Sequence, residues 1–341
     1  MTEKRTKIII TGGTGFIGRN LAEGLHNDGY HIVATGRDSK VGRLLQSQGI
    51  EFKAANLLSL SQLEEAFSPA DCVIHCAAKA GDWGLYNEFH EANVVGTRHV
   101  IQGCLRHGIK RVVFISTPSV YVDGTDRFNI RESEPLPPRQ LTHYSATKLA
   151  AERELFRSTQ KGVDVIVFRP RAVYGPHDRN FIPRIARMAE RGRFPLIAGG
   201  KSRVDVTYIG NFLDIVRAAL GAPHEAWNQV YNASNGDPIP ISRWFELMLG
   251  IVGVPFQPKN VPEIAAWSVA ALTELATRLP FGPRQPLTTR FSVRYMARSM
   301  TLSTEKAAKM LGYRRCFSTE ESFIDYAIKN DRLLSEVPID Q

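Results

Sequence analysis

Short apolar runs alternate with segments of helical periodicity through the first half of the chain. The runs at 7–11, 30–35, 50–54, 71–76, 111–116 and 163–168 predict strands, and the segments near 16–28, 38–48, 59–67, 85–107 and 143–160 predict helices between them. Runs such as Val112-Val113-Phe114-Ile115 are apolar without alternation, as parallel strands covered on both faces require. The pattern therefore predicts an α/β fold with a Rossmann-type, doubly wound parallel sheet.

This rhythm breaks after about residue 170, where prolines become frequent and Gly199-Gly200 closes the segment. A return to the sheet is expected at Gln229–Ala233, which follows a helical pattern at 211–220 and ends at the turn Asn235-Gly236. We therefore expect a dinucleotide-binding domain over 1–174 with a return at 206–235. A smaller C-terminal substrate-binding lobe would comprise 175–205 and 236–341.

Composition is that of a globular protein, with 43% hydrophobic and 23% charged residues. The apolar run at Ile8-Ile9-Ile10 is too short for the core of a signal peptide. The four cysteines, Cys72, Cys76, Cys104 and Cys316, lack the spacing of a metal site or a disulfide scaffold. We expect a cytoplasmic protein with reduced thiols and no metal.

The net charge is +9, and much of the excess lies in residues 169–203, which hold nine Lys and Arg against two acidic residues. Two interpretations stay open: a solvated helix face, or attraction of an anionic substrate or membrane surface. The first rests on arginines that recur opposite apolar positions: Arg184, Arg187 and Arg191 against Ile182, Ile185 and Met188. Nucleic acid is not expected, because interleaved aromatic residues and a reading motif are missing.

The stretch Pro262–Pro280 is rich in Ala, Leu, Ile and Trp. It contains Glu263, Glu274 and Arg278 and is barely long enough to span a bilayer, so a buried or lid helix is favoured over a transmembrane one. Contact with a membrane is not expected, although an interfacial helix stays open.

A glycine-rich turn follows the first predicted strand, with the sequence Gly12-Gly13-Thr14-Gly15-Phe16-Ile17-Gly18 before a helix. Glycines let the backbone turn sharply and approach a pyrophosphate, whose charge is met by free N–H groups at the helix start. The second strand ends in Gly36-Arg37, without the carboxylate that holds the ribose 2′-hydroxyl of NAD. Arg37 can instead meet a 2′-phosphate, so NADP is preferred over NAD as the cofactor.

Tyr144 and Lys148 stand four residues apart in a predicted helix, which puts them on one face. A phenol has a pKa of about 10, and a nearby ammonium favours its ionised form. The strand at 111–116 ends beside Thr117, which places hydroxyls at the carboxyl end of the sheet, where such folds bind ligands. Tyr144, Lys148 and Thr117 are therefore the candidate catalytic residues.

Together these segments resemble the extended short-chain dehydrogenase/reductase superfamily, which includes the NAD-dependent epimerases and dehydratases. The resemblance is carried by residues 11–18, 75–78, 93–97, 116–121, 144–148 and 169–176. It implies that Thr117 holds the reacting oxygen, that Tyr144 is the acid/base, and that Lys148 binds the nicotinamide ribose and lowers the pKa of the tyrosine. Ser116 and Ser119 stay open as alternatives to Thr117.

The resemblance also implies contacts to the ligands. Expected cofactor contacts are Gly12, Thr14, Gly15, Phe16, Ile17, Gly18, Arg37, Asn56, Leu57, Ala77, Ala78, Asn93, Tyr144, Lys148, Pro170 and Val173. Expected substrate contacts are Lys79, Trp83, Ser119 and Tyr174. Asn56 stands where many relatives have an aspartate, so the adenine contact is altered. A homodimer through the helices near 85–107 and 143–160 is expected by resemblance alone.

Residues 80–86, 116–120 and 286–289 are similar to the 3β-hydroxysteroid dehydrogenase and β-keto-acid reductase branch of that superfamily. This likeness implies interconversion of a secondary alcohol and a ketone on a bulky apolar, steroid-like or β-keto-acid substrate. Two alternatives remain: a sugar-nucleotide epimerase with tightly bound NAD, and a sensor that binds NADP without turnover. Pro118-Ser119 replaces the Asp-Glu pair of the dehydratases, which argues against dehydration.

Overall fold

Seven parallel strands form the central sheet of the computed structural model, which describes residues 5–179, 181–190, 192, 194–279, 281 and 283–336. Their order across the sheet is β12-β7-β5-β4-β1-β2-β3. The strands are β1 Lys7–Thr11, β2 His31–Gly36, β3 Glu51–Ala54, β4 Cys72–His75, β5 Arg111–Ile115, β7 Asp164–Pro170 and β12 Gln229–Ala233. The predicted doubly wound sheet is confirmed, and the expected return strand at 229–233 pairs with β7.

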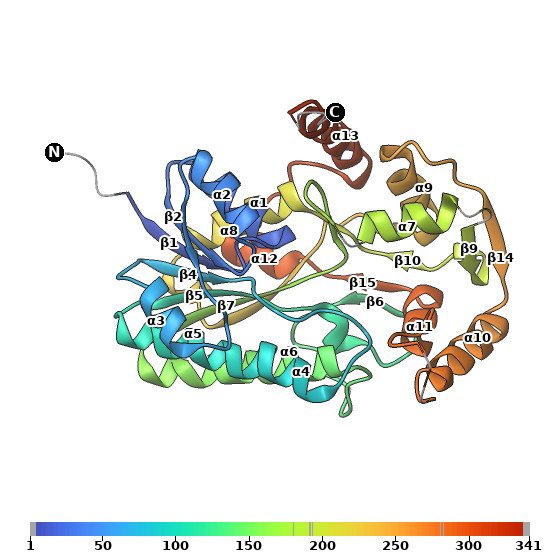
Figure 1. Ribbon diagram of the computed structural model, residues 1–341, viewed down its shortest axis with the longest axis horizontal. Coiled ribbons are helices and arrows are strands. Elements are labelled where there is room, and N and C mark those ends of the chain that lie inside the picture. Colours follow the sequence, from blue (N-terminus) through green and yellow to red (C-terminus); the bar gives the residue numbers. More distant parts are fainter. Residues whose placement is uncertain are drawn as a thin grey trace.

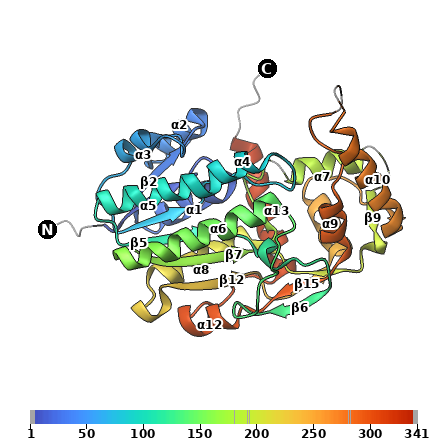
Figure 2. The ribbon, with the colours of Figure 1, turned by 90° about the horizontal axis from the view of Figure 1, so that it is seen from below.

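Helices cover both faces of this sheet (Figures 1 and 2). Alternate residues of β1 show why the strand is apolar throughout: Ile8 and Ile10 pack in one buried cluster, and Ile9 packs in the cluster on the other face. The helices around the sheet are α1 Phe16–Asn27, α2 Ser39–Ser47, α3 Leu60–Ala66, α4 Tyr86–His90, α5 Gly96–Arg106, α6 His143–Ser158, α8 Ile209–Leu220 and α12 Glu305–Leu311. A π-helical turn, Glu91–Val95, joins α4 to α5.

The remaining segments form a second lobe, on the right in Figure 1. Its four-stranded sheet has the order β13-β10-β15-β6, and two strand pairs, β8 with β11 and β9 with β14, accompany it. The strands are β6 Arg127–Ile130, β8 Val173–Tyr174, β9 Phe194–Ile197, β10 Arg203–Val204, β11 Thr207–Tyr208, β13 Ile239–Pro240, β14 Pro258–Val261 and β15 Met300–Leu302. The helices are α7 Phe181–Glu190, α9 Ile241–Ile251, α10 Glu263–Ala276, α11 Arg290–Ala297 and α13 Thr319–Glu336. The domain boundaries at 174 and 206–235 stay a prediction.

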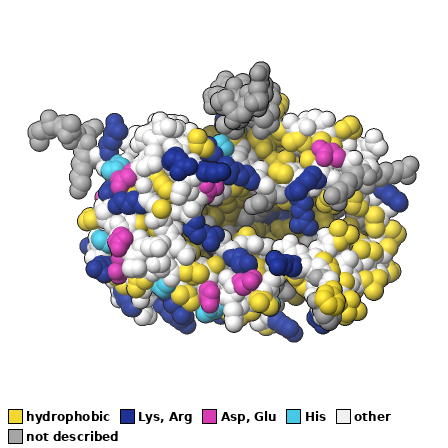
Figure 3. Space-filling model, in the orientation of Figure 1, with side chains coloured by type: hydrophobic (Ala, Val, Ile, Leu, Met, Phe, Trp, Pro, Cys, Tyr) yellow, Lys and Arg dark blue, Asp and Glu magenta, His cyan; other side chains and the backbone are white. Residues whose placement is uncertain are grey.

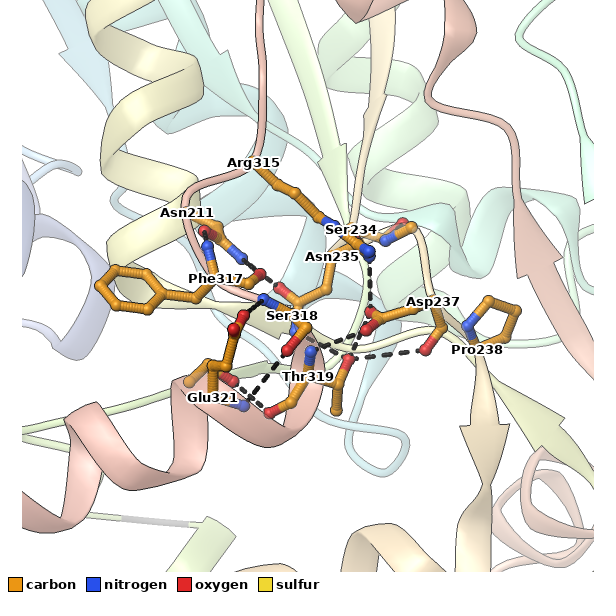
Figure 4. A network of polar contacts seen from close by, with 12 residues as sticks. Asn211, Ser234, Asn235, Asp237, Pro238, Arg315, Phe317, Ser318, Thr319 and Glu321 are labelled. Atoms are coloured by element: carbon orange, nitrogen blue, oxygen red, sulfur yellow. Dashed lines mark hydrogen bonds and ion pairs between the residues drawn. The ribbon is translucent and has the colours of Figure 1, made fainter.

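A polar network ties the C-terminal segment to the central sheet (Figure 4). Asn235 lies in the turn after β12, and its side chain accepts hydrogen bonds from the backbone N–H of Tyr208 and from Asn211, both at 2.9 Å. Asp237 accepts from the backbone N–H and the hydroxyl of Thr319 at 2.8 and 2.6 Å. The turn expected at 235–236 thus anchors the start of α13.

The stretch expected as a buried or lid helix forms α10, which lies at the outer end of the second lobe (Figures 1 and 2). Among the described segments, none forms a helix with the length and hydropathy needed to cross a bilayer.

Candidate active site

The glycine-rich turn between β1 and α1 is shaped for close approach of a ligand. Gly12 has a φ of +69°, and a Cβ there would lie 2.7 Å from the backbone nitrogen of Ala77. A Cβ on Gly18 would lie 2.3 Å from the carbonyl oxygen of Gly12. Gly15, the residue before α1, caps the helix with no side chain, so the first N–H groups are free to meet an anion. This geometry fits the pyrophosphate of a dinucleotide.

Arg37 follows β2 directly and is exposed, with no carboxylate paired to it among the described residues. The neighbouring Asp38 has another role, because its side chain accepts from the backbone N–H groups of Lys40 and Val41 and caps α2. The side chain of Asn56 also has a partner within the chain, because its oxygen accepts a hydrogen bond from the backbone N–H of Leu58 at 3.1 Å.

Helix α6 presents the expected Tyr–Lys pair. Its first turn is closed by a capping box, in which the Thr142 hydroxyl accepts from the backbone N–H of Ser145 at 3.0 Å. Tyr144 in this turn is half-buried and shares a hydrogen bond with Thr117, which follows β5. Lys148 is 1% exposed, and its ammonium donates to the carbonyl of Ile115 at 2.6 Å. The three candidate catalytic residues therefore meet at the carboxyl end of β5.

Burial is the largest influence on the pKa values of Tyr144 and Lys148. It raises the pKa of Tyr144 to about 12, with the hydrogen bond between Tyr144 and Thr117 acting in the opposite direction. It also lowers the pKa of Lys148 to about 7, although the nearby carboxylate of Glu152 favours the charged form. The expected lowering of the phenol pKa by Lys148 stays a prediction; in this structure the ammonium is turned toward the carbonyl of Ile115. Tyr144 thus holds its proton at neutral pH.

A buried ion pair lies behind Lys148. Glu152, one turn further along α6, accepts from the guanidinium of Arg169, and both side chains are almost fully buried. The Ser116 hydroxyl also donates to Glu152, and Arg169 donates to the Tyr121 hydroxyl at 2.7 Å. Ser116 is therefore engaged away from Tyr144, which favours Thr117 over Ser116 as the partner of the reacting oxygen. Ser119 lies beside Thr117 and accepts from its hydroxyl at 3.0 Å.

The segment after β4 is held by Asn93, which was expected to contact the cofactor. Its amide is 1% exposed and bonds the backbone N–H and carbonyl of Lys79 at 2.8 and 3.0 Å, as well as Thr147 of α6 at 3.0 Å. These bonds use the side chain fully, so Asn93 positions the strand end, including Ala77 and Ala78, against α6.

A cleft of about 860 Å³ opens beside the first turn of α6. Its walls come from the segment after β4, from the turn before Tyr144 and from α10 and α11. Its lining residues include Lys79, Asp82, Trp83, Trp267, Glu274 and Arg294. Lys79 and Trp83, two expected substrate contacts, thus face the cleft, and Lys79 is paired with Glu88 at 3.1 Å.

Asp82 joins the two lobes across this cleft. Its carboxylate accepts from the hydroxyls of Thr289 and Ser292 at the start of α11. The segments 80–86 and 286–289, which carried part of the sequence resemblance, are therefore neighbours in space. Charged acceptors make such hydrogen bonds stronger than those between neutral groups.

Sequence reasoning missed the arginines of the cleft. Arg278, Arg284 and Arg294 line it, and among the described residues none of the three is paired with a carboxylate. Arg294 is half-buried, with its guanidinium 4.8 Å from the ring centre of Trp267. The signal was present, because no acidic residue occurs between Glu274 and Glu305 while five arginines do.

Other expected residues lie elsewhere. Tyr174 is fully buried, bonds Ser322 and Asn235, and stacks on Phe323 beneath α13, a position that argues against contact with a substrate in the cleft. Pro170 ends β7 and Val173 begins β8.

The basic stretch 169–203 divides into buried and exposed parts. Arg169 and Arg171 are buried, so they do not face an incoming anion. In α7, Arg184 and Arg187 are exposed opposite the buried Ile182 and Ile185, as the solvated-face interpretation expects. Met188, expected on the apolar face, is 41% exposed because it lies at its edge. Arg191 lies outside the described residues.

The model of the NAD dependent epimerase/dehydratase family matches residues 8–234. The chain belongs to this family. It is 34% identical to a 2-alkyl-3-oxoalkanoate reductase from Stenotrophomonas maltophilia over 92% of this chain and 96% of that protein. It is 29% identical to the 3beta-hydroxysteroid-dehydrogenase/decarboxylase isoform 1 of Arabidopsis thaliana, over 92% of this chain and 77% of that protein.

Among solved structures, the chain is similar to a UDP-glucose 4-epimerase from Thermotoga maritima with UDP-glucose. The TM-score is 0.75 at 21% identity, over 96% of this chain and all of that one, so this likeness concerns the fold. The expected family, its dehydrogenase/reductase branch and an NAD(P)-dependent enzyme of the oxidoreductase type are confirmed. The roles of individual site residues, the preference for NADP and the homodimer stay predictions.

Proposed function

We propose that this enzyme is an NADP-dependent reductase of a ketone on a bulky, largely apolar substrate that carries a carboxylate. The observation that carries the proposal is the meeting of Tyr144, Thr117 and Lys148 beside an aromatic and basic cleft. The relatives named for 3-oxoalkanoate reduction and for hydroxysteroid oxidation support this substrate class.

The residues divide the chemistry among them. Bound nicotinamide supplies or accepts the hydride. Thr117 holds the carbonyl oxygen by a hydrogen bond, and Tyr144 donates a proton to it as the alcohol forms. The phenol of Tyr144 is protonated at neutral pH and so carries the proton that reduction of the ketone consumes. Lys148 lies one turn from Tyr144, where it can bind the nicotinamide ribose.

Arg294 is the residue best placed for the substrate carboxylate, since it is half-buried in the cleft without an acidic partner among the described residues. A planar guanidinium binds a carboxylate through two parallel hydrogen bonds. Trp83 and Trp267 supply apolar walls for the rest of the substrate.

The first test is a screen of β-keto acids, their methyl esters, hydroxysteroids and sugar nucleotides with both cofactors, followed by nicotinamide absorbance. We expect net oxidation of NADPH with β-keto acids and weaker use of the esters. In Tyr144→Phe, turnover should fall by about 10²–10⁴-fold while dinucleotide affinity persists, because only the proton donor is lost. Turnover retained by this variant would refute the role of Tyr144, and turnover of sugar nucleotides without net absorbance change would favour the epimerase.

The second test concerns Arg37. Replacing it by Ala should weaken NADPH binding by about tenfold or more, because a charge-assisted contact to the 2′-phosphate is lost, and leave NADH binding nearly unchanged. Titration of each nucleotide into the apoprotein measures both. The matched control is Lys40→Ala, because Lys40 is an exposed cation in the first turn of the following helix, α2. Equal losses for the two nucleotides would overturn the preference for NADP.

A further inference from the structure

Helix α10 has an unusual distribution of side chains. Its inward face carries Ala266, Ala270 and Glu274, which are buried, and Trp267 and Thr277, which line the cleft. Its outward face is largely apolar, with the exposed Ser268 among its members. The exposed apolar positions on that face and in the segment after it are Ile264 (82% exposed), Val269, Leu272 (66%), Leu275 (57%), Leu279, Phe281 and Leu287.

These exposed apolar residues lie close together in the chain, in and directly after α10 at the outer end of the second lobe, and are called the α10 face. Figure 3 shows hydrophobic side chains gathered at the lower right, where Figure 1 places α10. The surface helix of a globular protein normally turns its apolar residues inward. A concentrated apolar face pointing outward marks an interaction site.

The charges around the α10 face are positive. Glu263 is paired with Arg298, with both N–O distances at 2.8 Å, and Glu274 is paired with Arg290 at 2.7 Å. Both acidic side chains of the helix are thus neutralised within the lobe. Arg278 and Arg284, which also line the cleft, are exposed in the same stretch of chain as Leu279 and Leu287 and have no carboxylate partner among the described residues.

We propose that the α10 face docks on the surface of an anionic lipid bilayer, with its leucines in the acyl boundary and Arg278 and Arg284 against the lipid phosphates. Exposed apolar residues flanked by unpaired cations are the composition of interfacial helices. The helix is about 21 Å long at 1.5 Å per residue, shorter than the roughly 30 Å hydrocarbon core, so it lies on the membrane and does not cross it.

A second copy of the chain is a poorer occupant, because two α10 faces in contact would bring their unpaired arginines close together.

Docking also has a consequence for the cleft. Since the inward face of α10 lines the cleft, an apolar substrate dissolved in the bilayer would reach the cleft from the membrane side. This consequence rests on the proposed function, whereas docking does not.

The test is flotation of the full chain with vesicles, because aggregated protein does not float. Vesicles of phosphatidylcholine alone are compared with vesicles that also contain phosphatidylglycerol, at low and high salt. We expect flotation with the anionic vesicles that weakens in high salt. The pair Leu272→Ser and Leu279→Ser should lower the partition coefficient by about tenfold or more, because two inserted side chains are lost.

Two further variants sharpen the result. Leu44→Ser with Ile324→Ser removes two exposed apolar side chains elsewhere and should float as the unaltered chain does. Arg278→Gln with Arg284→Gln should remove most of the dependence on phosphatidylglycerol. Circular dichroism checks that each variant folds.

The proposal is overturned if the unaltered chain floats with neither vesicle, or if the Leu272 and Leu279 variant floats as well as the control pair. It is also overturned if ultracentrifugation shows a dimer that those leucine substitutions dissociate while vesicles have no effect. None of these readouts uses turnover, so failure of the docking and failure of the proposed reaction are distinguishable.

Discussion

The pKa values of two buried bases in the active-site region, Lys148 and His75, show how strongly burial changes the protonation of a side chain. Lys148 is almost fully buried, and burial brings its pKa down to about 7. His75, at the end of β4, is fully buried between hydroxyls, with Nδ1 2.7 Å from Thr11 and Nε2 3.0 Å from Thr97. Burial lowers the pKa of His75 to about 3, so it serves as a neutral bridge between β1 and α5 and not as a proton carrier.

His75 makes the fold sensitive to acid. The unfolded chain takes up a proton at this residue near pH 6.5, whereas the folded chain resists it down to about pH 3. Its contribution to stability is therefore present above pH 6.5 and is lost as the pH falls toward 3, by up to about 1.4 kcal/mol per pH unit. Denaturant unfolding of the unaltered chain and of His75→Gln over this range measures the effect.

The free-energy difference between these two proteins should shrink as the pH falls from 6.5. The exposed His224→Gln serves as the control for the loss of an imidazole. A difference that stays constant over the whole range would contradict the buried, neutral state of His75.

At the scale of elements, α6 carries most of the site, and a capping box fixes the residue at which this helix begins. The capping box of Thr142 and Ser145 defines the first turn, and Tyr144 lies within that turn. Lys148 and Glu152 then follow at intervals of four residues, so one face of one helix holds the phenol, the ammonium and the carboxylate that binds Arg169. The cap therefore acts on the position of Tyr144.

Removing that cap tests this link. Thr142→Ala should lower the free energy of unfolding by about 1 kcal/mol, because the N–H of Ser145 loses its acceptor. Hydrogen exchange in the first turn of α6 should become faster, and turnover should fall more than dinucleotide affinity. Thr142→Ser, which keeps the hydroxyl, should restore all three. An Ala variant as stable as the unaltered chain would show that the cap is unimportant.

At the scale of the whole molecule, the cleft exists because segments about 200 residues apart meet. The segment after β4 belongs to the Rossmann sheet, and α11 belongs to the second lobe, yet Asp82 binds Thr289 and Ser292 across the gap. The same arrangement brings Trp83, from the first of these segments, and Trp267, from α10, into the lining of one cleft. The hydrogen bonds of Asp82 thus connect the two lobes beside the cleft.

Asp82→Ala should loosen this junction. Hydrogen exchange at 283–297 should accelerate about tenfold, since hydrogen bonds to a charged group contribute about 1.5–3 kcal/mol. Dinucleotide affinity should not change, because the glycine-rich turn lies apart from the junction. Glu88→Ala is the control, because Glu88 lies in the same segment and, among the described residues, is paired with Lys79 and not with the second lobe. Equal exchange in the two variants would exclude a role for Asp82 in joining the lobes.

Much of the fold could be predicted because its signals are local. Strand Lys7–Thr11 and return strand Gln229–Ala233 coincide with the predicted ranges, since an apolar run between turn residues identifies a buried strand. The arginines of the cleft were missed because no motif or spacing links their stretch to the segment after β4, which they meet only in the folded chain. The spacing of Tyr144 and Lys148 did not indicate that burial raises the pKa of Tyr144, because spacing along a helix does not tell how deeply a phenol is buried.

The sequence by itself determined the Rossmann sheet, the glycine turn and the Tyr–Lys spacing, because hydrophobic period and backbone sterics act between residues close in the chain. Only the tertiary structure decided which distant segments wall the cleft, which way the ammonium of Lys148 points and which face of α10 is left outside. These features depend on how far each group is removed from water and on which partners it meets. Both are properties of packing between distant segments.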